Sequence, residues 1–152
     1  MTDPITFNSA TPRFALPLIY SAQAQKEMFV NEAMSRADAM MHCAIEGTVT
    51  APPTSATDGE NWLIGTGGSE DFAGHDGEIA CRQEGQWLFF TLSDGMRIFD
   101  REMGQQRLFL KEWREAQQAG SPSGGATIDA EARAAINEII TGLQNAGIFP
   151  VT

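Results

Sequence analysis

The sequence predicts an α+β fold in which a long N-terminal helix packs on an antiparallel β-meander and a linker-tethered C-terminal helix follows. Three observations lead to it: a helical apolar period early in the chain, a two-residue period with glycine turns in the middle, and a Gly/Ser-rich segment before a second helical pattern. The composition, 42% hydrophobic and 20% charged over 152 residues, is typical of a globular domain of ordinary size.

The long helix is expected over residues 21–45. Apolar residues recur there at three- and four-residue steps and form one stripe, which we expect to face the core. The preceding residues 1–15 hold prolines and few apolar side chains, which indicates an extended arm of the kind that lies on a neighbour. The stripe consists of Val30, Ala33, Met34, Ala37, Met41, Ala44 and Ile45.

The middle of the chain is expected to form short strands that pair antiparallel. Turns such as Glu84-Gly85 and Asp94-Gly95 separate apolar runs that alternate with polar residues. We expect strands at residues 61–64, 78–83, 86–92, 96–100 and 106–110. One face, turned toward the long helix, is expected to carry Trp62, Ile64, Ile79, Cys81, Trp87, Phe89, Ile98, Leu108 and Leu110.

The last part of the chain is predicted to be a tethered helix. Residues 119–126 (AGSPSGGA) have the composition of a flexible linker. Thr127 or Asp129 can cap a helix that ends near Gly147. Its apolar residues form a heptad seam of two heptads, which allows either packing on the sheet or self-association. The seam consists of Ala132, Ile136, Ile139, Leu143 and Ala146, of which Ile136, Ile139 and Leu143 are the oligomerisation candidates.

This pattern divides the chain into an arm (1–15), an α+β domain (16–118), a linker (119–126) and a C-terminal helix (127–147). The net charge of −10 disfavours nucleic acid, and we expect no nucleic-acid partner. No basic leader or bilayer-length apolar run occurs, so we expect cytoplasmic synthesis and no membrane insertion. Two cysteines, Cys43 and Cys81, are expected to be buried free thiols.

Catalytic and metal chemistry find little support in the sequence. Asp58, Glu60, Asp76 and Glu78 could act as paired carboxylates in glycoside cleavage, but Asp-Gly turns explain them better. The possible zinc ligands His42, Cys43, His75 and Cys81 lack the close pairs of a structural zinc site. No nucleophile elbow or phosphate loop is present. We therefore expect no enzyme activity, no metal and no cofactor.

Polar residues in line with the helical stripe, and aromatic residues on strands, are the binding or interface candidates. The polar residues can be explained by internal hydrogen bonds first, by a subunit contact second and by a ligand groove third. Since Phe89 is expected inside, Phe90 is expected outside, where it could stack on a sugar ring. The candidates are Gln23, Gln25, Lys26, Asn31, Glu32, Asp38, Trp87 and Phe90.

One run of residues resembles a known family. Residues 16–40 (LPLIYSAQAQKEMFVNEAMSRADAM) carry Leu-Pro, then Gln-Ala-Gln-Lys, Asn-Glu-Ala and Asp-Ala in order. With residues 50–53 (TAPP), 73–80 (AGHDGEIA) and the pattern of Gly85, Trp87 and Phe89, this run is similar to the signature of a phage-associated family of unknown function. The similarity covers residues 16–95, and residues 127–143 (TIDAEARAAINEIITGL) resemble the small head-spike proteins of alphaproteobacterial gene transfer agents.

The resemblance implies a non-enzymatic structural subunit of a phage-like particle. Such a subunit would form the base of a head spike on the capsid, next to a larger fibre protein, and would assist attachment to the capsule of the recipient cell. We expect it to be a homo-oligomer, a pentamer or alternatively a trimer, assembled on the outside of a particle released from the cell. The alternative function is a carbohydrate-binding module for capsular polysaccharide.

Overall fold

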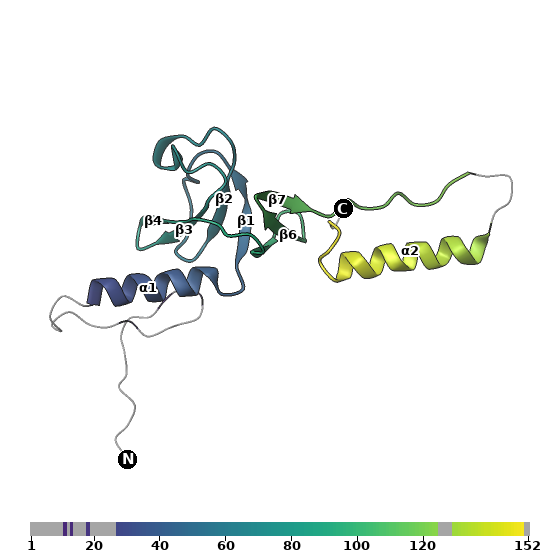
Figure 1. Cartoon of the computed structure of the whole chain (residues 1–152), viewed down its shortest axis with the longest axis horizontal. Helices are drawn as coiled ribbons and strands as arrows, with labels where there is room; N and C mark the ends of the chain where they lie inside the picture. Colours follow the sequence, from purple (N-terminus) through teal and green to yellow (C-terminus); the bar gives the residue numbers. More distant parts are fainter. Residues whose placement is uncertain (1–10, 12, 14–17, 19–26, 125–128, 151–152) are drawn as a thin grey trace, which may run out of the picture. The chain divides into compact units, whose positions relative to one another are not determined.

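The computed structural model of the chain describes residues 11, 13, 18, 27–124 and 129–150 (Figure 1). Those residues form two α-helices, seven strands and one short 3-10 helix, so the predicted α+β class is confirmed. The chain divides into two compact units. Unit 1 consists of Met1–Cys43 and Thr48–Thr91, and unit 2 consists of Ala44–Gly47 and Leu92–Thr152. No helix within the described ranges is both long and apolar enough to span a bilayer.

The strands form a mixed sheet and not the predicted simple meander. In unit 1, β4 (Gln86–Phe90), β3 (Ile79–Gln83) and β2 (Asn61–Ile64) lie side by side in antiparallel pairs. In unit 2, the start of β1 (Ala44–Val49) pairs parallel with β5 (Arg97–Asp100). β6 (Gln105–Leu110) and β7 (Glu112–Glu115) then add antiparallel neighbours.

The five strands that the sequence predicts all exist, within two residues at each end. β1 and β7 were not predicted. β1 is missed because Ala44 and Ile45 continue the helical spacing of the preceding residues. β7 is missed because Trp113 is its only large apolar residue and because the turn before it has Lys111, at a φ of 63°, where glycine would be expected.

The prediction of a long helix over residues 21–45 is wrong at its C-terminal end. α1 spans Glu27–Met40, 14 residues, and residues 21–26 lie outside the described part. The expected orientation is also wrong, because Met34 and Met41 on the apolar stripe are 38% and 40% exposed. Among residues 30–40 of α1, the buried side chains are instead Ser35, Asp38 and Ala39.

The buried Asp38 explains this orientation. The Thr11 hydroxyl donates a hydrogen bond to Asp38 Oδ1 (2.7 Å), and the Arg13 backbone N–H donates to Oδ2 (3.0 Å). The Arg13 guanidinium also donates to the carbonyl oxygens of Asp38, Ala39 and His42. These carbonyls belong to the last turn of α1 and its exit, where no intrahelical donor is left. Arg13 therefore acts as a side-chain cap for the end of α1.

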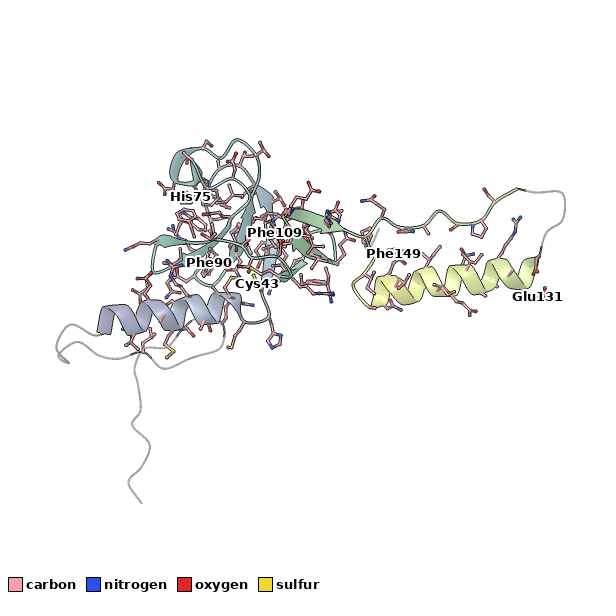
Figure 2. The ribbon with its side chains drawn as sticks, viewed as in Figure 1. Cys43, His75, Phe90, Phe109, Glu131 and Phe149 are labelled. Atoms are coloured by element: carbon pink, nitrogen blue, oxygen red, sulfur yellow. The ribbon has the colours of Figure 1, made fainter. Side chains whose placement is uncertain are left out.

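The sheet of unit 1 is covered on both faces. On one face the Asn61 amide donates to the Ala39 carbonyl (3.1 Å), and the Arg36 guanidinium lies 5.4 Å from the centre of the Phe90 ring. α1 therefore lies on this face, as the position of Phe90 in Figure 2 shows. Strand register places Leu63, Ile79 and Cys81 on the same face.

The opposite face carries Trp62, Ile64, Ala80, Trp87 and Phe89. Phe72, fully buried, packs there against Ile64 and Ala80. The prediction of one apolar face toward the helix is thus wrong in two respects. Ile79 and Cys81 do not share a face with Trp62, Ile64, Trp87 and Phe89, and α1 lies on the face of the first pair. Strand β3 is buried on both sides, so its residues show no alternation that the sequence could reveal.

The loop that carries Phe72 is closed by a carboxylate. Asp76 accepts hydrogen bonds from the backbone N–H groups of Gly67 (2.9 Å) and Gly68 (2.8 Å). These two bonds lower the pKa of Asp76 below its ordinary value. A side chain at position 68 would clash with the Phe72 carbonyl oxygen. The absence of a side chain at Gly68 therefore allows its backbone to lie close to the backbone of Phe72.

Both cysteines are buried free thiols, as predicted. Burial raises the pKa of Cys43 to about 11 and the pKa of Cys81 to about 12. Both are therefore protonated at neutral pH and serve as small apolar side chains under α1.

The Asp76 contact gives a pH-dependent prediction. Because the folded-state pKa is lowered, the stabilisation is complete above the ordinary pKa of 3.8 and is lost as pH falls through the folded-state value. We expect Asp76→Asn to unfold at a lower temperature than the wild type at pH 7, with a gap that closes below pH 3.8. Asp71→Asn, on the same loop, is the control in thermal melts. An equal deficit at all pH values would contradict the role of the charge.

Candidate assembly interface

α2 (Ala130–Asn145) is held at both ends by local hydrogen bonds. The Asp129 side chain caps its start by accepting from the Ala132 N–H (2.9 Å), as one of the two predicted caps. At its end, Gly147 takes a φ of 67°, and the N–H groups of Ile148 and Phe149 both donate to the Leu143 carbonyl. This is the glycine-dependent helix stop that the sequence predicts.

The segment before α2 runs beside the helix within unit 2 (Figure 1). The Gln144 side-chain amide donates to the Gln118 side chain (3.1 Å) near the end of α2, and the Arg133 guanidinium donates to the Gly124 carbonyl near its start. Ile140, between them along the helix, is only 7% exposed. At 100° per residue, Arg133, Ile140 and Gln144 share one face of α2. This face, which we call the tethered face, is the one that α2 uses inside its own unit.

The heptad seam of α2 borders the tethered face on the side away from Gln144. At 100° per residue, Ile136, Leu143 and Ile139 lie about 40°, 60° and 100° from Ile140. Ile136 is 42% exposed, Ile139 is 61% exposed and Leu143 is half-buried. Of the two alternatives left by the sequence, burial of the seam against the sheet of the same chain is therefore not what the structure shows. Ile136 and Ile139 are exposed in the described part of the chain.

The polar candidates of the N-terminal helix have different surroundings. Asp38 is satisfied by hydrogen bonds within the chain, so the first-ranked explanation is confirmed for this residue. Glu32 forms an exposed ion pair with Arg36 (2.9 Å). Asn31 is half-buried and has a partner inside the structure. Gln23, Gln25 and Lys26 lie outside the described residues.

The two aromatic candidates are engaged within unit 1. Phe90 is 7% exposed, so the prediction that it points to solvent is wrong. It pairs in register with Ile79, on the face that α1 covers. Trp87 is half-buried: the Phe72 ring meets it edge-on at 5.0 Å, and the Arg82 guanidinium lies 5.0 Å from its centre. A sugar that stacks on Trp87 would have to displace Arg82.

The four carboxylates that could have served glycoside cleavage all bond to nearby groups in unit 1. Besides Asp76, Asp58 accepts from the Gly85 N–H (3.4 Å) and Glu60 from the Thr57 N–H (3.1 Å). Glu78 pairs with His75 (2.8 Å), whose ring stacks on Phe89. The turn interpretation therefore accounts for their positions. Among the described residues, no three His, Cys, Asp or Glu side chains gather as they would around a metal ion.

What sequence reasoning missed here is the tethered face of α2. Its signal is present in the sequence, because Arg133, Ile140 and Gln144 recur at helical spacing. A heptad search passes over this row because two of its three members are polar.

Comparison with known proteins gives a family but no function. A family model described as a protein of unknown function (DUF2793) matches residues 30–114, more than half of the chain. No curated protein matches the chain.

The different burial of Ile140 and Ile139 predicts unequal effects of the same truncation. In the monomeric chain at high dilution, Ile140→Ala should reduce the free energy of unfolding by about 2 kcal/mol, because it removes a buried side chain. Ile139→Ala, at an exposed position, should change it by less than about 0.5 kcal/mol. Denaturant titration followed by far-UV circular dichroism measures both. Equal losses would show that Ile139 is buried inside the monomer.

Proposed function

Because the chain belongs to the DUF2793 family, whose function is unknown, we propose its role from its own surfaces and from its signature residues. We propose that it is a structural subunit of a phage-like particle of the gene-transfer-agent kind. In this role it forms the base of a capsid head spike or fibre that assists attachment to the host cell surface or capsule.

The observation that carries the proposal is the open seam of α2. Complete burial of an isoleucine side chain is worth about 1.5–3 kcal/mol, and Ile136 and Ile139 leave much of that unrealised in the single chain. The tethered face holds the helix in place, so little further ordering is needed when a partner covers the seam. A second copy of the chain offers the same apolar row, which supports self-association.

The residue types of the seam favour more than two copies. In the heptad frame, Ile136 and Leu143 occupy a positions and Ile139 a d position. Isoleucine at both a and d, or leucine at a with isoleucine at d, shifts coiled coils from dimers toward trimers and tetramers. Two heptads are short for an isolated coiled coil, so we place the helices in a closed ring in which other parts of the subunits add to the contact. A pentamer, as on a capsid vertex, or a trimer, as in a fibre, fits this requirement.

The remaining parts of the proposal concern partners. The capsid protein and a spike-fibre protein are the expected neighbours, and the cell-surface polysaccharide is the expected target of the assembled spike. Support comes from the Gln-Ala-Gln-Lys and Asn-Glu-Ala signature, which resembles proteins of prophage fibres and gene transfer agents. No catalytic step is assigned to the chain.

Particles purified from the producing culture test this function. We expect the wild-type chain to co-purify with them in a fixed ratio to the capsid protein. The double variant Ile136→Asp/Ile139→Asp should fold but be absent from the particles, because burying two carboxylates costs several kcal/mol. Particles without the chain should still form and should adsorb less well to recipient cells.

The matched control replaces two exposed residues of α2 away from the seam, as Ala134→Asp/Asn137→Asp. This variant should enter particles like the wild type. If the particles never contain the wild-type chain, the proposed function is refuted. If the seam variant enters particles normally, the seam is not needed for assembly.

A further inference from the structure

Unit 2 contains a cavity of about 300 Å³ that no role above uses. It lies over β6, between the ends of β5 and β7 and the segment that follows α2. Its walls include Arg97, Gln106, Leu108, Arg114, Glu115 and Ile148.

Strand register brings two arginines to the same row of the sheet. Arg97 on β5 and Arg114 on β7 are each the direct partner of Leu108 on β6. Neighbouring strands lie about 4.8 Å apart, so the backbones of the two arginines are separated by about 10 Å with Leu108 between them. Both long side chains can therefore converge on one group bound above Leu108.

The charges of the site differ from those of the whole chain, which is strongly acidic. Arg107 is held by Asp100 (2.7 Å) and by Glu115 (3.4 Å). Within the described ranges, the ion pair of Arg114 is a long one, 3.8 Å to the exposed Glu112. Arg97 is exposed and makes no ion pair with any described residue. Arg97 and Arg114 are thus available to an anion.

One wall of the cavity is fixed by hydrogen bonds within unit 2. Gln105 is fully buried. The nitrogen of its side-chain amide, oriented toward the carbonyls of Ala116 and Ile148, donates to both (3.1 Å and 3.2 Å). The Gln106 N–H donates to the Gly147 carbonyl (2.6 Å). These bonds hold Ile148 in position next to the sheet, so the cavity is formed before any ligand arrives.

We propose that this cavity binds a compact molecule that carries one carboxylate. Guanidinium groups match a carboxylate through paired hydrogen bonds, and Leu108 and Ile148 supply apolar contact for the body of the ligand. The cavity is open to solvent, and its volume of about 300 Å³ is at the low end for ligand sites, which favours a small body of about one ring. Glu112 lies 3.8 Å from Arg114 and offsets part of its charge, while Glu115, which pairs with Arg107, also lines the cavity. These carboxylates favour a single negative charge on the ligand over a dianion or polyanion. The inference does not depend on the role of the α2 seam.

Two ring acids and their neutral analogues test the proposal on the full chain. Glucuronate with glucose represents a sugar acid, and benzoate with benzamide represents an apolar acid. Titrations followed by ¹H–¹⁵N NMR should show at least one acid shifting the signals of Gln106, Leu108 and Arg114, and its neutral analogue binding at least tenfold more weakly. Which acid binds identifies the source of the carboxylate.

Arg97→Gln and Arg114→Gln should each raise the dissociation constant for that acid at least fivefold. Lys111→Gln removes the same charge from an exposed residue that does not line the cavity and should leave binding unchanged. The proposal would be overturned if neither acid binds, or if the neutral analogue or inorganic phosphate binds as well as the acid. Binding of an acidic peptide alone would also overturn it. If all three variants lose binding alike, the net charge of the chain and not this cavity explains the binding, and the proposal fails.

Discussion

The contact between α2 and the segment before it decides which surface the chain offers to other molecules. Ile140 is buried there, and Arg133 and Gln144 fasten the two ends of the helix to that segment. With Ile140 turned toward that segment, Ile139, about 100° away around the helix, is 61% exposed, and Ile136 is 42% exposed. The exposure of these two isoleucines follows from how the helix is held. This is the physical basis for treating α2 as an assembly element.

Unit 1 is organised by a different constraint, the need to satisfy a buried carboxylate. Asp38 turns the polar side of α1 toward the chain because Thr11 and Arg13 supply its hydrogen bonds. An ionised carboxylate left buried without partners would cost several kcal/mol, far more than the exposure of Met34 and Met41. The same arginine then caps the end of α1. A few polar contacts therefore outweigh the apolar stripe that dominates the sequence pattern.

These two cases show what the sequence could and could not predict. The central strands β2 to β6 were predictable because turn residues bound short runs rich in apolar residues, and α2 because Asp129 and Gly147 mark its ends. The orientation of α1 was not, since it depends on a hydrogen bond between residues 27 positions apart. The seam residues were predictable from spacing, whereas their exposure depends on Gln118 and Gly124, which no local pattern links to the helix. The pairing of Arg97 and Arg114 across Leu108 requires the register of β7, a strand that the sequence pattern did not reveal.

The most direct test of the central claim is the solution mass of the purified chain, measured by light scattering at micromolar concentration and moderate salt. Salt matters because each copy carries a net charge of −10, and screening lessens the repulsion between copies. The account predicts a single defined oligomer, three or five times the chain mass, that becomes a monomer when the residues after Gly120 are removed. A wild-type chain that stays monomeric, or an oligomer that survives the truncation, would contradict it.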